Sequence, residues 1–534
     1  MSDKLALVVD AVRSRPLTSL VVSNSVTAFV ALWLHTRGQG GLWRWFAKTA
    51  FRTVIGFFRV VAKDMVAAEE QKVKKKTVDM VMSSVEGPKF TSIPEQGMKK
   101  SELISLMQQS SKKETKWREG KISGTVYHSG PELADVICEA FKAFSVSNPI
   151  HPDVFPTCRK MEAEVVAMCC SLFGGGPDAA GTMTSGGTES IIMAVKAHRD
   201  YAREVRGILE PELVKPASAH AAFDKACHYL GVKMVEVPVH PETFQVDLAR
   251  VRRAVNRNTV LIVGSAATYP QGVMDDIPAL GQIALKHGCG LHVDNCLGSL
   301  LLPFLPAAGY PVRPFDLSVP GVTSLSADTH KFGFAPKGSS VVLYRSMELR
   351  RHQFFVAADW SGGLYATPSM AGSRPGGLIA GAWAALVYMG KDGYTRSAKE
   401  IMTAAAGVVA AVKAVPELKL MGEPIASVIC FGPRDPSRLN IYNVSDALSA
   451  RGWSLSVLQN PGCIHICVTH VHTAEGVIPR FAEDLAWAVA DVTTAPKNKY
   501  KDGKGAIYGM AAVIPDRSMV AGIAADYLEA LYTA

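Results

Sequence analysis

The chain has 534 residues, 48% of them hydrophobic, which is enough for a large core and more than one domain. Its formal net charge of +9 is unevenly placed, because residues 1–121 contain 21 Lys and Arg against 11 Asp and Glu. This composition excludes a disordered protein. Since no recognisable nucleic-acid-binding module accompanies the basic excess, we expect no nucleic-acid partner.

Residues 1–76 are predicted to form a membrane-anchoring arm. Residues 16–36 carry no charge, and these 21 residues are just long enough, as a helix, to span a hydrocarbon core of about 30 Å. A cleaved signal peptide is the alternative, but basic residues follow the segment and no clear small-x-small site does. Basic residues are also more frequent after the segment than before it, so the rest of the chain should face the cytosol.

Residues 42–66 are predicted to form an amphipathic helix within this arm. At helical spacing most of its aromatic and β-branched residues lie opposite one narrow basic stripe, made of Arg44, Lys48, Arg52, Arg59 and Lys63. Such a helix suits the headgroup plane of a bilayer, and packing against the folded part of the chain is the alternative. Residues 77–120 are then expected to be a linker.

Residues 121–385 are predicted to form a large α/β domain with a mostly parallel sheet, because helical patterns alternate with short apolar strands. The elements expected there are helices at 162–173 and 190–206 and strands at 260–264, 291–293 and 340–343. Residues 386–534 are predicted to form a smaller α/β domain. Its expected strands are at 425–431, 453–458 and 463–468.

The ten cysteines are scattered and form no Cys-x-x-Cys pair, which favours reduced thiols over disulfides or zinc. Cys463 and Cys467, with His465 and His470 nearby, could also be metal ligands. Alternation along a short strand explains their spacing more simply, so we expect no metal site.

The stretch from Ser185 through Gly186 and Gly187 to Thr188 predicts an anion site at the start of a helix. Its glycines allow close backbone approach, its hydroxyls add donors, and the following apolar run continues as a helix. Unpaired N–H groups and the helix dipole favour an anion such as phosphate there. A plain capped helix is the alternative.

Two further candidate residues follow in the chain. His220 could stack on an aromatic ligand, and Asp294 ends a short apolar strand, at the tip where α/β sheets place their ligands. A satisfied core histidine and a capping aspartate are the simpler readings of each residue alone.

Lys331 directly follows His330 on the loop that leaves another apolar run, and Gly333 follows it. A lone His-Lys pair is weak evidence, and an ordinary solvated loop is the simpler reading. Glycine turn, His220, Asp294 and Lys331 in this order nevertheless supply one partner each for the phosphate, ring face, pyridine nitrogen and aldehyde of pyridoxal phosphate.

The chain resembles the pyridoxal-phosphate enzymes of the aspartate-aminotransferase fold, also called fold type I. Within the group that contains the amino-acid decarboxylases, it is most similar to the sphingosine-1-phosphate lyases. The resemblance extends from about residue 85 to the C-terminus. Its most specific parts are Ala327 to Lys331 with the second lysine Lys337, Asp359 to Tyr365, and Ala371 to Gly376.

This resemblance implies roles for individual residues. The catalytic residues would be Lys331 as the Schiff-base lysine, Tyr269 as the base for the 3-hydroxyl proton, and His330. The residues expected to bind pyridoxal 5'-phosphate are Ser185, Gly186, Gly187, Thr188, His220, Asp294, Cys296, His330 and Lys331. The residues expected to bind the substrate and its phosphate are Tyr127, Asn148, His151, Lys337 and Ser373.

The resemblance also implies the reaction and the setting. Phosphorylated sphingoid bases would be cleaved between C2 and C3 in a retro-aldol step, giving a long-chain aldehyde and phosphoethanolamine. The chain would be a homodimer, held in the endoplasmic reticulum membrane by a single span. The alternatives are an amino-acid decarboxylase of the same fold, which needs neither the arm nor Lys337, and a membrane-tethered scaffold without catalysis.

Overall fold

The computed structural model describes residues 75, 87–114, 116–496, 499–500 and 517–533. The predicted membrane span and the predicted amphipathic helix both lie outside the described residues. None of the helices that the structure describes is long and apolar enough to cross a membrane. Residues 111–508 form one compact unit. The described residues up to 110 and from 517 onward belong to a second unit, which contains most of α5 (Lys100–Ser111) and all of α17 (Arg517–Leu531).

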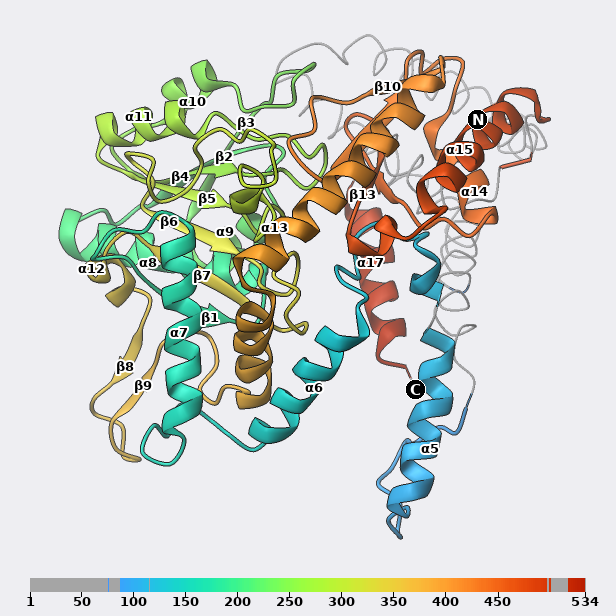
Figure 1. The fold of residues 1–534 in the computed structure, drawn as a ribbon. Coiled ribbons are helices and arrows are strands. Elements are labelled where there is room, and N and C mark those ends of the chain that lie inside the picture. The colour runs from blue at the N-terminus through green and yellow to red at the C-terminus, as the bar shows by residue number, and fades with distance from the viewer. Residues whose placement is uncertain (1–74, 76–86, 115, 497–498, 501–516, 534) are drawn as a thin grey trace, which may run out of the picture. The chain divides into compact units, whose positions relative to one another are not determined.

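A seven-stranded sheet lies at the centre of residues 111–508, with the strand order β1-β7-β6-β5-β4-β2-β3 (Figure 1). All neighbouring pairs from β6 to β3 are parallel, and β7 runs antiparallel to both β1 and β6. The predicted mostly parallel sheet is therefore confirmed. Its strands are β1 (Ala180–Thr184), β2 (Glu212–Pro216), β3 (Lys233–Val237), β4 (Thr259–Ser265), β5 (Gly290–Asp294), β6 (Ser324–Ala327) and β7 (Ser340–Tyr344).

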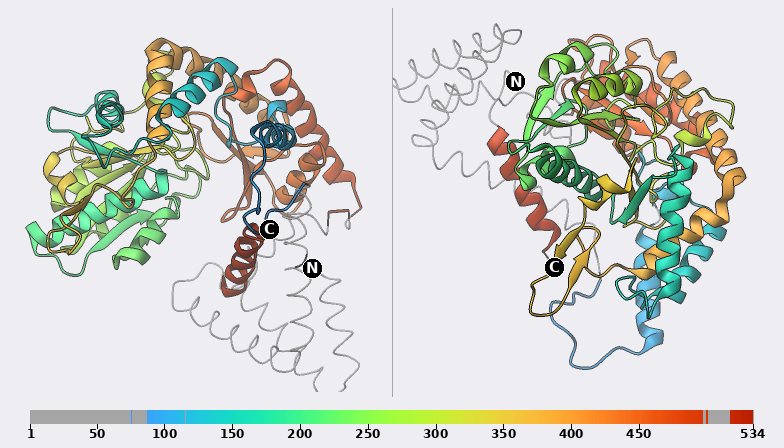
Figure 2. Two further views of the ribbon diagram at one scale, coloured as in Figure 1. Left: turned by 90° about the horizontal axis from the view of Figure 1, so that it is seen from below. Right: turned by 90° about the vertical axis from the view of Figure 1, so that its left-hand side faces the viewer.

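Helices cover both faces of this sheet (Figure 2), and the strand sequences explain why. Residues 260–263 of β4 are Val-Leu-Ile-Val, so apolar side chains point to both sides of the strand. Leu261 and Val263 pack with α8 (Gly187–Arg206) and α9 (Ala222–Leu230). Ile262 packs in the opposite core with α7 (Pro156–Leu172) and α11 (Ile277–His287). The remaining elements up to residue 367 are η2 (Lys112–Glu114), η3 (Lys116–Glu119), α6 (Pro131–Phe144), α10 (Leu248–Ala254), η4 (Leu302–Phe304), α12 (Met347–Arg351), β8 (Phe355–Ala357) and β9 (Tyr365–Thr367).

A four-stranded antiparallel sheet follows in the chain, with the order β10-β11-β13-β12. The long helix α13 (Gly376–Ala414) precedes it and is interrupted at Gly390, whose φ of 57° is left-handed. The predicted domain boundary at residue 385 falls inside this helix and remains a prediction. The elements of this region are β10 (Leu418–Leu420), β11 (Val428–Pro433), α14 (Ile441–Ala450), β12 (Ser456–Leu458), β13 (Cys463–Cys467), η5 (His470–Thr473) and α15 (Val477–Thr494).

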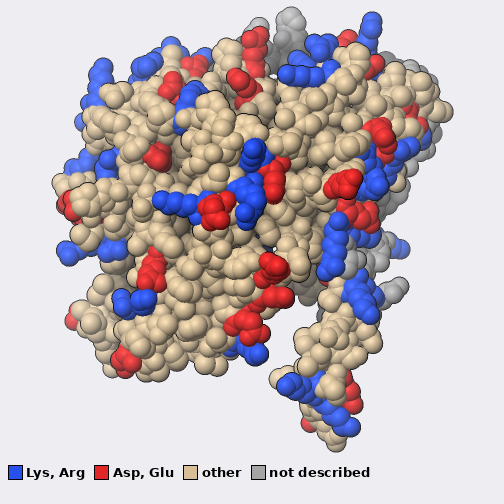
Figure 3. Space-filling model, viewed as in Figure 1, with Lys and Arg blue, Asp and Glu red and all other residues tan. Residues whose placement is uncertain are grey.

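Positive and negative charges nearly balance in the part of the chain that follows residue 121. Residues 122–534 contain 36 Lys and Arg against 37 Asp and Glu. Acidic and basic side chains are interspersed on the face of the molecule drawn in Figure 3. The face drawn in Figure 3 therefore offers no broad single-sign surface for a polyanion.

Candidate active site

The candidate residues gather at one edge of the large sheet because of the strand directions. β1 leads into Gly186, β2 into His220, β4 into Tyr269 and β6 into Lys331, and Asp294 ends β5. These strands all run in the same direction, so their carboxyl ends meet at one edge. This is the edge where open α/β sheets bind their ligands.

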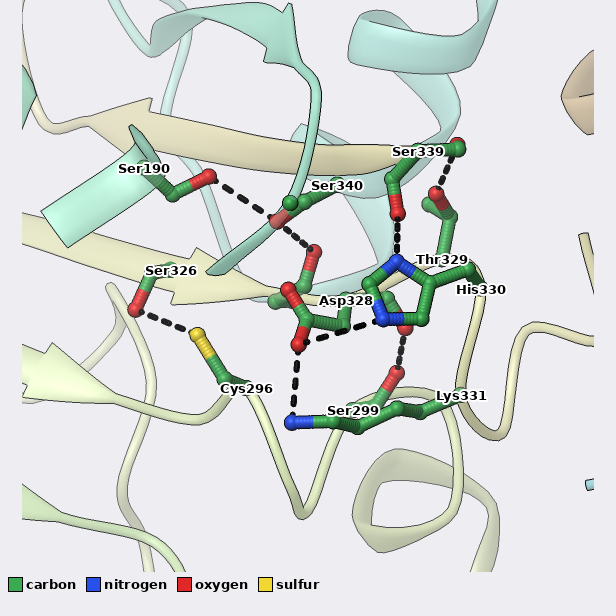
Figure 4. Close-up of polar contacts among 12 residues, drawn as sticks. Ser190, Cys296, Ser299, Ser326, Asp328, Thr329, His330, Lys331, Ser339 and Ser340 are labelled. Atoms are coloured by element: carbon green, nitrogen blue, oxygen red, sulfur yellow. Dashed lines mark hydrogen bonds and ion pairs between the residues drawn. The ribbon is translucent and has the colours of Figure 1, made fainter. Parts of the chain in front are cut away.

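Lys331 lies on a tight turn directly after β6 (Figure 4). The backbone N–H of Lys331 donates to the carbonyl of Asp328 at 3.1 Å, and its own carbonyl accepts from Phe334 at 2.9 Å. This turn directs the lysine amine back toward Asp328, and Nζ lies 2.8 Å from Oδ2. The Asp328 side chain is 3% exposed, so the structure places a nearly buried ion pair at the site.

Burial and charge oppose each other at Lys331. Loss of water around the amine acts to lower its pKa, but the carboxylate of Asp328 and its other acidic neighbours outweigh this effect, and the net pKa is raised. In the described structure Lys331 is therefore an ammonium at neutral pH.

His330 is fixed by a bond to the backbone. Its Nδ1–H donates to the carbonyl of Ser339 at 2.6 Å, because a carbonyl can only accept. Burial lowers the pKa of His330, with Asp328 opposing this effect. A neutral ring whose Nε2 carries the lone pair follows, and that nitrogen lies 3.8 Å from Oδ2 of Asp328.

The N-terminus of α8 lies directly against this ion pair. A Cβ built on Gly187 would stand 2.7 Å from Sγ of Cys296 and 2.8 Å from Oδ1 of Asp328. Only glycine fits this position without displacing a neighbour. The preceding Ser185 donates both its backbone N–H and its hydroxyl to Glu189, at 2.7 and 2.6 Å. These two donors are therefore already engaged, and Gly187 and the exposed Thr188 remain as the residues that open the helix.

Asp294 is held by its oxygen Oδ1, which accepts from the backbone N–H of Cys296 at 3.0 Å and from Ser326 at 3.4 Å. The thiol of Cys296 donates to the same Ser326 hydroxyl at 3.2 Å. Burial, followed by the charges of Asp294 and Asp328, raises the pKa of Cys296 well above its usual value. The Cys296 thiol is therefore uncharged. It lines the site and is not a thiolate nucleophile.

His220 and Tyr269 lie at the same sheet edge in more open positions. Nδ1 of the exposed His220 accepts from the backbone of Ala222 at 3.0 Å, and within the described chain no hydrogen bond joins it to Asp294 or Lys331. The Tyr269 ring is 47% exposed and stands edge-on to His465 of β13, with centroids 4.9 Å apart. The second sheet therefore helps to orient Tyr269.

Lys337 and Tyr127 form the second cationic position of the site. Nζ of Lys337 lies 4.7 Å from the centroid of the Tyr127 ring, and that ring packs edge-on against Phe332 at 4.9 Å. Loss of water around the amine, and then the charge of Lys331, lower the pKa of Lys337. Burial, and then Cys467, raise the pKa of Tyr127, so the phenol is neutral at physiological pH.

Asn148 and Ser373 are far apart in sequence but are joined in the structure. The Asn148 amide donates to the Ser373 hydroxyl at 3.0 Å, and its oxygen accepts from the backbone of Arg374. Arg374 forms a two-point bond with Glu162 of α7 at 2.9 and 2.7 Å, which anchors the loop that carries Ser373. His151 lies exposed in the turn that follows Asn148 and donates its backbone N–H to it at 3.1 Å.

The sequence analysis gave no role to two residues that the structure places in the site. Asp328 belongs to the His-Lys stretch, and an acidic residue three positions before the lysine was the available signal. Cys467 comes from β13, and its electrostatic neighbours include Lys331, Lys337 and Tyr127. Nothing in the sequence around Cys467 distinguishes it from an ordinary strand residue.

Comparison with known proteins identifies the family. The family model of the pyridoxal-dependent decarboxylase conserved domain matches residues 116–434. The sphingosine-1-phosphate lyase 1 of Mus musculus is 47% identical over 469 residues, which cover 87% of this chain and 82% of the mouse protein. The chain belongs to the sphingosine-1-phosphate lyase family.

Solved structures agree with this assignment. The sphingosine-1-phosphate lyase structure from Burkholderia pseudomallei is 43% identical and matches with a TM-score of 0.74, covering 77% of this chain and 95% of that chain. A glutamate decarboxylase structure from Lactobacillus brevis is 21% identical, with a TM-score of 0.65 over 78% of this chain and 97% of that chain. This second likeness shows the common fold alone.

Pyridoxal phosphate is the cofactor of the family to which this chain belongs. The side chains at the candidate site fit this cofactor. A Cβ at Gly186 would meet only Cε1 of His330, at 3.8 Å, so the N-terminus of α8 is open to a phosphate there. When pyridoxal phosphate is bound, Asp294 would offer a carboxylate to the pyridine nitrogen, and Lys331 would offer the amine that bonds to the aldehyde carbon. The buried Oδ1 of Asp328 has no hydrogen-bond partner among the described residues, as expected of a site built for a further group.

A Gly187→Ala variant should bind pyridoxal phosphate roughly ten- to a hundredfold more weakly, since the added methyl must displace Cys296 or Asp328. Titration of the cofactor by absorbance measures this affinity. Gly176→Ala is the matched control, because a Cβ there would meet nothing within 4 Å. Equal cofactor affinity in the two variants would show that the close approach at Gly187 is not needed for binding.

Proposed function

We propose that this chain is a carbon-carbon lyase that cleaves phosphorylated sphingoid bases between C2 and C3, giving a long-chain aldehyde and phosphoethanolamine. Relatives whose names state this activity align over most of the chain, at 47% identity for the mouse protein. The structural observation that carries the proposal is Lys337, a second cationic group beside Tyr127 and apart from the cofactor lysine. A substrate phosphate needs such a group in addition to the cofactor's own phosphate site.

The chemical obstacle is the negative charge that develops at C2 as the C2–C3 bond breaks. When bound, pyridoxal phosphate supplies the electron sink for this charge. Asp294 supports that role by holding a proton on the pyridine nitrogen, since a carboxylate favours the charged form of a nearby base. Cys296 and Ser326 fix the carboxylate that does this.

Two residues are placed to handle protons. The 3-hydroxyl group must lose its proton for the aldehyde to form, and the Tyr269 oxygen is the candidate acceptor because the ring is held by His465 at the open side of the site. The Lys331 amine is the candidate donor to C2 of the phosphoethanolamine product.

A Lys337→Ala variant tests the substrate assignment. Losing one charge-assisted contact of about 1.5–3 kcal/mol should weaken the apparent affinity for phosphorylated base roughly ten- to a hundredfold. Cofactor absorbance should be retained, because Lys331 and the α8 N-terminus are unchanged. Steady-state kinetics with phosphorylated and unphosphorylated sphingoid bases measures the effect, and the variant should lose most of the preference for the phosphate.

Lys391→Ala, which removes an exposed lysine of α13, is the control for general loss of charge. Equal loss on both substrates would mean that Lys337 supports the Lys331 loop and does not bind the phosphate. Release of carbon dioxide from an amino acid, with no aldehyde from phosphorylated base, would contradict the lyase activity itself.

We also propose that the arm anchors the chain in the endoplasmic reticulum membrane by a single span, with the active site facing the cytosol. This proposal rests on the uncharged segment at 16–36 and on the basic stripe after it. All candidate site residues lie beyond Gly120, so a chain that begins near Ser83 should leave the membrane fraction and stay active on detergent-dispersed substrate. Sedimentation and aldehyde release measure the two properties. A folded, cofactor-loaded but inactive truncation would make the arm part of the active site.

The chain is further proposed to be a homodimer. The β8–β9 hairpin presents large apolar side chains to solvent, with Trp360 57% and Leu364 77% exposed. Contiguous exposed apolar groups of this kind favour a protein contact. Light scattering of the detergent-solubilised chain tests the oligomeric state.

A further inference from the structure

Asp328 is the buried acid whose role the proposed function leaves open. We propose that Asp328 is a positioning residue that holds the amine of Lys331 as an ammonium whenever that amine is not bonded to the cofactor. This inference deepens the proposed function and rests on Lys331 being the cofactor lysine. It assigns Asp328 the task of keeping a transferable proton at Nζ.

Three observations on the geometry of Asp328 support this assignment. Oδ2 of Asp328 lies 2.8 Å from Nζ of Lys331, while the Lys331 side chain is 22% exposed and the Asp328 side chain 3%. The backbone carbonyl of Asp328 accepts from the Ser299 hydroxyl and from the Lys331 N–H. The carboxylate also contacts the Gly187 position at the α8 N-terminus. Ser299 and the turn of Lys331 therefore hold the backbone of Asp328, and the close packing at Gly187 limits where its carboxylate can move.

The position of Asp328 is unusual for an acid, because the N-terminus of α8 is where the cofactor phosphate is expected to bind. A carboxylate beside a phosphate would repel it unless a cation lies between or beside them. Lys331 is that cation while its amine is free. The positive charge of a protonated Lys331 therefore offsets the negative charges of Asp328 and of the cofactor phosphate.

Several other titratable groups face Lys331, and Asp328 has the shortest contact. The groups are Asp328, His330 and Lys337 on its own loop, Asp294 and Cys296 after β5, and Cys467 on β13. The neutral His330 and Cys296 contribute no charge. Lys337 opposes a second positive charge at Nζ, so the carboxylate of Asp328 is needed to keep the proton there.

The proton balance of the resulting step is simple. One N–H bond at Nζ breaks, the proton forms the new C2–H bond of the phosphoethanolamine product, and Nζ keeps the electron pair as a neutral amine. A neutral amine is the form that can bond to an aldehyde carbon again. An amine that was neutral from the start would be far too weak an acid to protonate C2, and it would compete for that carbon before the product had formed.

The test measures the protonation of Lys331 without any substrate. The full chain, freed of cofactor, is treated with formaldehyde and cyanoborohydride from pH 7 to 11, and methylation of Lys331 is followed by peptide mass spectrometry. Only the neutral amine reacts. In the wild type the rate at Lys331 should keep rising to the top of the range, and its curve should lie at higher pH than the curve measured at the exposed Lys391. If the reagents reach Lys331 less easily, its methylation rate falls by the same factor at every pH. The midpoint of its rate against pH is therefore not changed by limited access.

Asp328→Asn should lower the midpoint by at least about one pH unit, which makes methylation at pH 8 about tenfold faster. Asp328→Ser is the second variant, and Asp484→Asn is the control that removes a buried carboxylate elsewhere, where it pairs with Arg451. Circular dichroism confirms that each variant is folded. Unchanged midpoints in folded Asp328 variants would overturn the proposal. If neither variant folds, a wild-type Lys331 midpoint at or below that of Lys391 would overturn it. Neither outcome bears on whether phosphorylated bases are cleaved, which the aldehyde assay decides separately.

Discussion

A Lys331→Ala variant is expected to bind pyridoxal phosphate with no covalent attachment and to lose activity by about 10⁵-fold, the advantage that a positioned amine provides over a free one. Gly187 at the start of α8 and the Asp294 carboxylate are unchanged, so non-covalent binding of pyridoxal phosphate should remain. Borohydride reduction followed by peptide mass spectrometry measures the attachment. Aldehyde release from phosphorylated base measures the activity.

Lys337→Ala is the matched control for this experiment, because it removes a lysine of the same loop and should leave the label on Lys331. A reduced cofactor label on Lys337 or on another lysine in the wild type would mean that Lys331 has been assigned wrongly. Retained covalent attachment in Lys331→Ala would have the same meaning. Loss of activity alone would not distinguish these cases, so the label is the decisive measurement.

The sequence predicted the parts of the site that depend on local chain geometry. Asp294 and Lys331 follow or end an apolar run, and Gly186 and Gly187 precede a helix, and these positions are visible from a few neighbouring residues. The sequence grouped these residues as partners of one cofactor, and the structure places them at one edge of the sheet. The mostly parallel sheet follows from the same alternation of helices and strands.

Contacts between distant segments could not be predicted in this way. The antiparallel β7 lies between β1 and β6, although β7 follows both in sequence, and hydrophobic pattern alone gives no strand order. The bond between Asn148 and Ser373 depends on how two loops pack. The engagement of Ser185 by Glu189 was also hidden, because an acid in the first turn of a helix has many possible partners.

Asp328 shows most clearly that a sequence motif does not indicate all of the chemistry of a site. From the sequence alone, Asp328 was one residue of the stretch from Ala327 to Lys331, with no role of its own. The structure shows that the same carboxylate contacts both the lysine amine and the start of α8, two groups with opposite requirements. A charged residue in a crowded anion site needs a compensating charge, and here that charge is Lys331 itself.

The second large effect is expected for Asp294→Asn, which should reduce the rate of C2–C3 cleavage by about 10²- to 10³-fold. Asparagine has the same shape, and its oxygen can still accept from Cys296 and Ser326, so the fold and cofactor binding should be retained. The lost negative charge is what favours a proton on the pyridine nitrogen. Single-turnover measurements should show the loss in the chemical step, with little change in substrate affinity.

Asp275→Asn separates this electrostatic role from a structural one. Asp275 is also buried after a strand of the same sheet, and its carboxylate accepts backbone N–H groups from Val246 at 2.8 Å and Ser265 at 2.9 Å. Asparagine replaces one of these two acceptor oxygens with an NH2 group that faces a backbone N–H donor, which should lower thermal stability while leaving the rate per cofactor-loaded molecule nearly unchanged. Asp294→Asn should show the reverse pattern, a slow enzyme of near-normal stability. A near-normal cleavage rate in Asp294→Asn would mean that the ring nitrogen does not need this carboxylate, and the electron-sink role assigned to Asp294 would then be wrong.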